Sequence, residues 1–177
     1  FINRNIYISC AIRLYQMLQK YSRYGILQEF FDYPRKEFYL RELSRMTNLA
    51  LPSVTNHIRA LVDGGLILRQ KNGLYPTFKA NRDSILFKIY KKTNLMLRLH
   101  ETGLIDYLND GLFPNAIILY GSSSKGEDVE ESDIDLFIQA KEKKIDVSKY
   151  EKLLNRKVHL FFGEIFNNYR EPGEYHL

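Results

Sequence analysis

The spacing of hydrophobic residues in the first third of the chain predicts a group of short helices. Between residues 24 and 63, apolar side chains recur every three or four positions, which is the period of an amphipathic helix. The first helix ends at Pro34, the second spans residues 41–47, and the third starts near Pro52. Asn48 stands between the second and third helices, where a residue that tolerates a left-handed turn is needed. The pattern therefore predicts three helices with a tight turn before the third.

Shorter apolar runs follow the third helix and predict a β-hairpin. Residues 66–69 and 74–78 form two such runs, and an Asn-Gly pair at position 72 provides a hairpin turn signal between them. A further short strand is expected at residues 38–40. The order helix, strand, helix, turn, helix and hairpin resembles the winged helix-turn-helix family of many microbial transcription regulators. The resemblance covers residues 24–83 and implies a DNA-binding module.

The rest of the chain predicts a second module built around a small sheet. Residues 84–110 carry a long helical pattern, which we expect to link the two modules, with Thr102-Gly103 as the place where it would break. Three strands and two intervening helices are expected after it. The strands are predicted at residues 116–120, 133–138 and 157–162, and the second of the two helices at residues 147–154. This β-α-β-α-β order predicts a mixed sheet with helices on one side.

Charge divides the chain into the same two parts. Residues 1–92 contain 16 Lys and Arg against 6 Asp and Glu, a net charge of +10, whereas residues 93–177 contain 10 against 15, a net charge of −5. A basic part favours nucleic acid as its partner, and an acidic part needs cations. The Leu and Ile residues of the linking helix suit either the chain's own core or a homodimer.

Composition also bears on the compartment. No apolar run approaches the length of about 18 residues that a membrane-spanning helix needs, and the first residues lack a secretory signal pattern. The single Cys10 excludes a disulfide framework, so we expect a buried thiol in a reducing cytoplasm. Met17 is a candidate native start, in which case residues 1–16 would be a fragment or an over-extended gene prediction.

Two carboxylates on one predicted strand carry the main chemical signal. Only Ile134 separates Asp133 from Asp135, so alternation along a strand directs both carboxylates to one face, about 7 Å apart. Like charges at this spacing repel unless a cation lies between them, and a divalent metal is the usual partner. Upstream, Gly121-Ser122 ends an apolar strand and opens a short helix, whose N–H groups and hydroxyl suit phosphate oxygens. Metal ligands beside a phosphate cradle predict phosphoryl or nucleotidyl transfer.

These residues also match a known pattern. The sequence Gly-Ser-Ser-Ser-Lys-Gly at residues 121–126, followed by Ser-Asp-Ile-Asp-Leu at residues 132–136, resembles the signature of the DNA polymerase beta-like nucleotidyltransferase superfamily, and more closely its minimal nucleotidyltransferases. The fold class expected is therefore α+β, with a winged helix-turn-helix, a linking helix and a nucleotidyltransferase sheet. The expected boundaries are an extension at residues 1–23, then residues 24–83, 84–110 and 111–177.

The resemblance implies roles for individual residues. Asp133 and Asp135 would bind two Mg²⁺ ions, with the nucleoside triphosphate as substrate. The residues expected to bind the nucleotide are Gly121, Ser122 and Lys125 at its phosphates, with Gly126 allowing the loop to turn close to it. Some relatives are antitoxins that adenylylate a partner toxin, which makes a protein a candidate acceptor.

The third carboxylate of the family pattern is absent. His159 stands where the family carries an Asp, on the strand predicted at residues 157–162. A neutral imidazole can bind a borderline metal such as Mn²⁺ or serve as a base, but it adds no negative charge and Mg²⁺ prefers oxygen. Glu164 is the nearest other carboxylate and would need a bend at Gly163 to reach the site. The alternatives are a catalytic His159 and a His that fills one strand position in an inactive enzyme.

The third helix and the hairpin carry the residues expected to contact DNA. In a winged helix-turn-helix the third helix enters the major groove and the wing contacts the backbone. Candidates for base contacts are Ser53, Thr55, Asn56 and Arg59. Candidates for phosphate contacts are Arg35, Lys36, Arg41, Arg45, Arg69, Lys71 and Lys79. Winged helices also form protein interfaces with the same core pattern, so that alternative stays open.

The sequence thus predicts a metal-dependent nucleotidyltransferase that moves a nucleoside monophosphate from a nucleoside triphosphate to a hydroxyl acceptor, joined to a module that binds double-stranded DNA. The alternative is a DNA-binding regulator whose degenerate transferase domain senses nucleotide, which the histidine at position 159 favours. Two interaction modules without a ligand would explain neither the paired carboxylates nor the phosphate turn.

Overall fold

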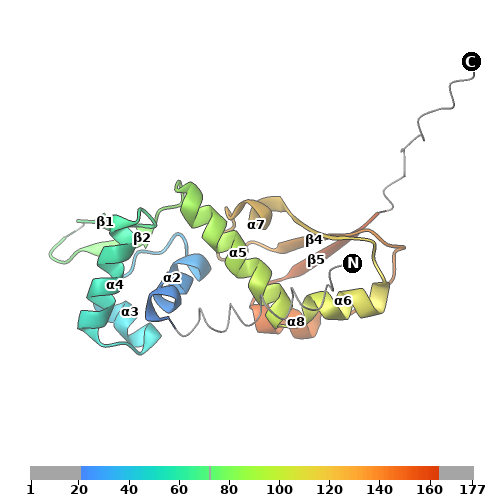
Figure 1. Cartoon of the computed structure of the whole chain (residues 1–177), viewed down its shortest axis with the longest axis horizontal. Helices are drawn as coiled ribbons and strands as arrows, with labels where there is room; N and C mark the ends of the chain where they lie inside the picture. The colour runs from blue at the N-terminus through green and yellow to red at the C-terminus, as the bar shows by residue number, and fades with distance from the viewer. Residues whose placement is uncertain (1–20, 72, 164–177) are drawn as a thin grey trace, which may run out of the picture.

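The computed structural model describes residues 21–71 and 73–163 (Figure 1). Within these residues the chain forms seven helices and two small sheets, so the α+β class is confirmed. None of the described helices is long and apolar enough to cross a membrane. Cys10, Met17 and Glu164 lie outside the described residues, as does most of the expected extension at residues 1–23.

The N-terminal module, residues 21–83, contains three helices and a hairpin. Its helices bury apolar side chains in one common core, which includes Phe30, Phe38 and Leu43. Asn48 adopts the expected left-handed conformation, with φ of 53°. The elements of this module are α2 (Ser22–Asp32), α3 (Leu40–Thr47), α4 (Leu51–Asp63), β1 (Ile67–Gln70) and β2 (Thr77–Ala80).

Two details of the N-terminal module differ from the sequence prediction. The strand expected at residues 38–40 is only a single bridge between Phe38 and Phe78, because Tyr39 is the N-cap of α3 and its N–H donates to Glu42 Oε2 at 3.4 Å. The hairpin loop is longer than an Asn-Gly turn, because the last pair in the ladder is Gln70 with Thr77. Proline at position 76 lacks an N–H donor, which explains why the second strand begins after it.

The expected linking helix is two helices. Helix α5 (Ile85–Glu101) and helix α6 (Leu104–Leu112) are separated by Gly103, whose φ of 78° ends a continuous helix. Figure 1 shows α5 running between the two modules. Its Phe87 belongs to the N-terminal core, whereas its Leu95 and Leu99 belong to a second core. Helix α5 therefore contributes side chains to the hydrophobic cores of both modules.

The sheet module, residues 104–163, has the mixed topology that the sequence predicts. The strands lie in the order β3-β4-β5, with β3 antiparallel and β5 parallel to the central strand. Leu104 and Leu108 of α6 pack on the side of the sheet that carries Ile134 and Leu136. The elements are β3 (Ile117–Tyr120), α7 (Gly121–Lys125), β4 (Ile134–Ile138), α8 (Ser148–Leu154) and β5 (Val158–Phe162).

Polar contacts also join the two modules. Arg35, which follows α2, donates from Nε to Glu130 Oε2 at 2.8 Å and also pairs with Glu131. On α5, Arg98 Nη1 donates to Asp32 Oδ1 at 2.7 Å. Glu130 and Glu131 lie in the loop that leads into β4, so the N-terminal module contacts the segment just before the paired aspartates.

Candidate functional site

The alternation of β4 directs its carboxylate to the side of the sheet opposite the helices. Ile134 and Leu136 are buried in the second core, while Asp135 between them is only half-buried and points the other way. Asp133 directly precedes the strand and is also half-buried. The structure thus presents both carboxylates on the face of the sheet away from the core.

His159 lies between the two carboxylates. The parallel register of β4 and β5 pairs Asp135 with His159. The Nε2 atom of His159 lies 3.7 Å from Asp133 Oδ2, and its Nδ1 atom lies 3.7 Å from Asp135 Oδ1. The structure therefore brings the three residues proposed for catalysis together, while their catalytic roles stay a prediction.

The donor set fits a divalent cation that takes part of its coordination from a substrate. In residues 21–71 and 73–163, no group of three or more His, Cys, Asp or Glu side chains is arranged to hold a metal by itself. Mg²⁺ is commonly bound through one or two carboxylates together with substrate phosphates, which suits the oxygens of Asp133 and Asp135. The imidazole of His159 suits Mn²⁺ better than Mg²⁺.

Gly121 lies directly against the carboxylate of Asp135. Its φ is +68°, and a Cβ atom at this position would lie 2.5 Å from Asp135 Oδ2. Antiparallel pairing explains the proximity, because Tyr120 is the register partner of Asp135. Ser122 and Lys125 are exposed on the short helix α7 that follows. The turn expected to bind phosphate thus begins against one of the two aspartates.

Gly126 has a packing role that the sequence did not indicate. It is buried with φ of +70°, and a Cβ atom there would lie 2.2 Å from the carbonyl oxygen of Lys88 on α5. The backbones of α5 and the end of α7 therefore meet at this glycine. This close approach explains why position 126 needs a glycine. The expected role of Gly126 near the nucleotide stays a prediction.

Aromatic rings extend the same face of the sheet. Tyr120 and Phe161 meet edge to face with ring centroids 5.5 Å apart, and the ring of His159 lies 6.4 Å from that of Phe161. Burial raises the pKa of Tyr120 above its ordinary value, and the charge of Asp135 raises it further. Tyr120 therefore stays a neutral phenol beside the carboxylates.

Sequence reasoning missed a group of buried charges behind the site. Arg156, Asp128 and Lys91 come from three separate segments and meet in the structure, with Lys91 and Asp128 only 4% and 5% exposed. Burial lowers the pKa of Lys91, although the nearby Asp128 opposes the shift. The sequence gives one signal for such a group, which is a Lys at a core-facing position of an amphipathic helix.

A comparison with known families agrees with this geometry. Residues 103–164 match the family model described as polymerase beta, nucleotidyltransferase. The match supports the nucleotidyltransferase superfamily for this segment. It contains Gly121, Asp133, Asp135 and His159, and it begins where α5 gives way to α6. Neither the curated proteins nor the solved structures gave a match.

The residues expected to contact DNA are distributed over the N-terminal module. On α4, Asn56 and Arg59 are exposed, whereas Ser53 is half-buried and the hydroxyl of Thr55 donates to the carbonyl of Leu51. On the hairpin, Arg69 and Lys71 are exposed.

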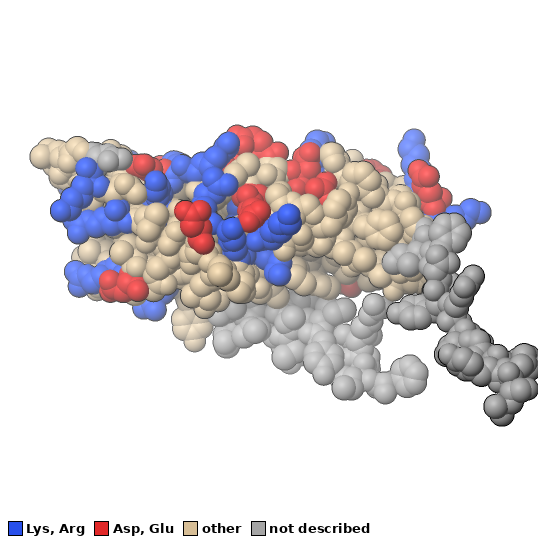
Figure 2. Space-filling model, turned by 90° about the horizontal axis from the view of Figure 1, so that it is seen from above, with Lys and Arg blue, Asp and Glu red and all other residues tan. Residues whose placement is uncertain are grey.

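Two of the residues expected to contact phosphate already form ion pairs within the chain. Arg35 pairs with Glu130 and Glu131, and Lys36 pairs with Glu42. The view in Figure 2 shows Lys and Arg side chains gathered over the N-terminal module and its boundary with the sheet module.

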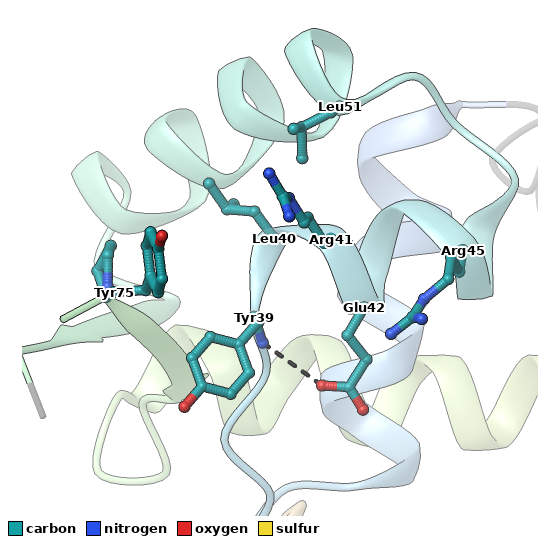
Figure 3. A pocket seen from close by; sticks show the side chains of 8 residues that line it. Tyr39, Leu40, Arg41, Glu42, Arg45, Leu51 and Tyr75 are labelled. Carbon is teal, nitrogen blue, oxygen red and sulfur yellow. Dashed lines mark hydrogen bonds between the residues drawn. The ribbon is translucent and has the colours of Figure 1, made fainter. Parts of the chain in front are cut away.

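An apolar pocket lies on the N-terminal module between α3, the start of α4 and the hairpin loop (Figure 3). Its volume is about 420 Å³. The lining includes Tyr39, Leu51 and Tyr75, of which Tyr75 is 67% exposed, and Arg41 and Arg45 also contribute. Exposed aromatic and aliphatic side chains suit a protein partner as well as a nucleic acid, so the pocket keeps both alternatives for this module open.

Proposed function

We propose that the chain transfers a nucleoside monophosphate from a nucleoside triphosphate to a hydroxyl acceptor. The observation that carries the proposal is the position of His159 between Asp133 and Asp135, beside the turn at Gly121. In the reaction, the acceptor oxygen forms a bond to the α-phosphorus, and the bond from that phosphorus to the bridging oxygen breaks. Pyrophosphate leaves, the proton of the acceptor hydroxyl passes to solvent, and His159 would supply a nitrogen ligand to the metal that lowers the pKa of that hydroxyl.

The remaining site residues bind and orient the nucleotide in this proposal. Asp133 and Asp135 would hold divalent cations, whose charge would neutralise the phosphates and favour attack on phosphorus. Ser122 and the backbone N–H groups of the turn bind phosphate oxygens, and Lys125 adds positive charge. The divalent cation is Mg²⁺ or Mn²⁺.

Calorimetric titration with ATP tests the nucleotide site. Binding is expected to depend on Mg²⁺ or Mn²⁺ and to be lost in the double variant Asp133→Ala/Asp135→Ala. Each single variant should weaken metal-dependent binding less, because the other carboxylate keeps part of the negative charge. Equal binding by the double variant and the wild type would reject the site.

The N-terminal module is proposed to be a winged helix-turn-helix that binds double-stranded DNA. The support is its order of elements, the exposed Asn56 and Arg59 on α4, and the basic charge of this part of the chain. Binding by the whole chain should weaken steeply as salt rises. Arg59→Ala should reduce the preference between sequences, whereas Lys71→Ala should weaken binding to all duplexes about equally. Binding that is insensitive to salt and to both variants would favour a protein interface instead.

A second candidate function is a DNA-binding regulator that senses nucleotide without turnover. Two observations favour it: a histidine replaces the third carboxylate, and Arg35 of the N-terminal module is bonded to Glu130 in the loop before Asp133. If the chain is such a regulator, ATP with Mn²⁺ should change its affinity for DNA, and no label should be transferred from the nucleotide. If the chain is an enzyme, label should be transferred from the nucleotide to an acceptor.

A further inference from the structure

Arg156, in the turn between α8 and β5, donates hydrogen bonds to two backbone carbonyls at the entrance to β4. Its Nε atom lies 2.7 Å from the carbonyl oxygen of Ser132, and its Nη2 atom lies 3.0 Å from that of Asp133. The ladder between β4 and β5 begins only at Ile134, whose N–H donates to the carbonyl of Lys157. Arg156 thus holds the backbone on both sides of the peptide bond that joins Ser132 to Asp133.

The same guanidinium reaches the helix of the phosphate turn. Nη2 of Arg156 lies 3.0 Å from the hydroxyl of Ser123, a fully buried residue of α7. That hydroxyl in turn donates to the carbonyl of Asp133 at 3.4 Å. The guanidinium of Arg156 therefore joins α7, the helix of Ser122, to Asp133, whose carboxylate is a proposed metal ligand.

A buried carboxylate fixes the orientation of Arg156. Nη1 of Arg156 donates to Asp128 Oδ2 at 2.8 Å, and the side chain of Arg156 is only 14% exposed. Lys91, on α5, lies 3.4 Å from the same oxygen and also donates to the carbonyl of Asp128. A buried ion pair is weak evidence for net stability, although removing one partner leaves the other charge uncompensated. The bond to Asp128 fixes the direction in which the guanidinium points.

We propose that Arg156 is a positioning residue of the nucleotidyl-transfer site, which sets the separation between Asp133 and helix α7. The proposal rests on the proposed function and adds a residue outside the Gly-Ser turn and the paired aspartates. Arginine is required because its rigid fork directs several donors at once, whereas lysine offers a single point of charge. Loss of the fork lets Asp133 move relative to the turn without removing any group that contacts the nucleotide or metal.

The test compares Arg156→Lys and Arg156→Met with the wild type in the full chain. Mn²⁺ affinity in the presence of ATP is measured by calorimetry, and thermal melting is measured on the same samples. Lysine keeps a positive charge beside Asp128, so Arg156→Lys should melt close to the wild type. Its Mn²⁺ affinity should nevertheless fall by about tenfold to a hundredfold, the usual effect of losing a group that orients a metal ligand. Methionine should lose both affinity and stability.

Two further variants serve as controls. Arg98→Lys is the matched control, because Arg98 is also a partly buried arginine that bonds a carboxylate and a backbone carbonyl. Among the described residues, the hydrogen bonds of Arg98 go to Asp32 and Leu154 rather than to Asp133 or α7, so this variant should leave Mn²⁺ affinity within twofold of the wild type. Ser123→Ala removes one acceptor of Arg156 and should weaken Mn²⁺ binding several-fold, and it decides the matter where the arginine variants fail to fold.

The outcomes separate the positioning role from the proposed function. If Arg156→Lys binds Mn²⁺ as tightly as the wild type, the positioning role is overturned and the transferase proposal stands. Where the arginine variants fail to fold, the same result in Ser123→Ala has this meaning. An equal loss in Arg98→Lys would show a general effect on the fold and overturn the positioning role as well. Absence of metal-dependent ATP binding in the wild type would reject the transferase proposal and this inference together.

Discussion

Gly121 lies against Asp135 so closely that a Cβ on the glycine would come within 2.5 Å of the carboxylate Oδ2. The two residues are adjacent because the last residue of β3, Tyr120, pairs with Asp135 across the antiparallel ladder. A glycine at this turn thus meets two demands at once. It adopts a φ of +68°, and it leaves room for a charged side chain that we expect to bind metal.

Gly121→Ala should therefore abolish metal-dependent ATP binding while the chain still folds. The added methyl group has to displace the Asp135 carboxylate, and the left-handed backbone adds about 1 kcal/mol of strain. The matched control is Gly103→Ala, since Gly103 has a φ of +78° with nothing within 4 Å of its ideal Cβ. Both variants should melt at lower temperature, but only Gly121→Ala should lose ATP binding in calorimetry. Loss of binding in both would contradict a local effect on Asp135.

Much of this site follows from local patterns. Alternation places Asp133 and Asp135 on one side of β4, and the position of His159 on a later strand follows from the same period. Their meeting depends on the register between β4 and β5, which the sequence predicted only through a family resemblance. Local rules were enough to assign each residue to its strand and face, because each lies on, or directly before, a regular strand, whereas their proximity required the register.

The parts that could not be predicted depend on contacts between distant segments. Lys91, Asp128 and Arg156 lie on a helix, a loop and a turn, and no periodicity connects a loop to a turn. Gly126 was interpreted through the nucleotide, whereas its backbone meets that of Lys88. The hairpin turn was misjudged because an Asn-Gly signal was followed by a proline that prevents pairing. In each case tertiary contacts decided the outcome.

Glu151 on α8 should make the start of β5 sensitive to acid. Its Oε1 accepts from the N–H of Val158 at 3.0 Å and its Oε2 accepts from Lys157 Nζ at 3.1 Å. The bond from Val158 is the main cause that lowers the pKa of Glu151 below 4.5. A carboxyl whose pKa is lower in the folded state stabilises that state above the unfolded pKa, and this contribution disappears as pH falls through the folded value.

Glu151→Gln should therefore melt below the wild type at pH 7, and the difference should shrink once the pH falls below 4.5. The amide oxygen of glutamine can still accept one hydrogen bond, so the lost part is the charge. Thermal melting of both proteins between pH 7 and pH 3 measures the difference. Glu142→Gln, at an exposed position in the loop before α8, is the control that should show no such trend. A difference that stays constant with pH would contradict the linkage.

His159→Asp should make the melting temperature of the chain depend more strongly on bound metal. The new carboxylate would lie near Asp133 and Asp135, at positions where His159 nitrogens now lie 3.7 Å from their oxygens. Because the residue is about half exposed, each new repulsion is worth about 1 kcal/mol, the value for a pair at 4 Å in water. In chelator the variant should melt below both the wild type and the neutral control His159→Asn. Mg²⁺ should reverse the loss, since it prefers oxygen ligands.

The same variant distinguishes enzyme from regulator. The imidazole of the wild type accepts Mn²⁺ more readily than Mg²⁺, so transfer of label from NTPs should be slow in Mg²⁺ and faster in Mn²⁺. In His159→Asp the preference should disappear as activity in Mg²⁺ rises. Candidate acceptors are the chain itself, a protein partner and the ends of tRNA. Transfer by the wild type in Mn²⁺ would establish an enzyme. Transfer by His159→Asp alone would show a competent scaffold that lacks its third ligand, and would favour the nucleotide-sensing regulator.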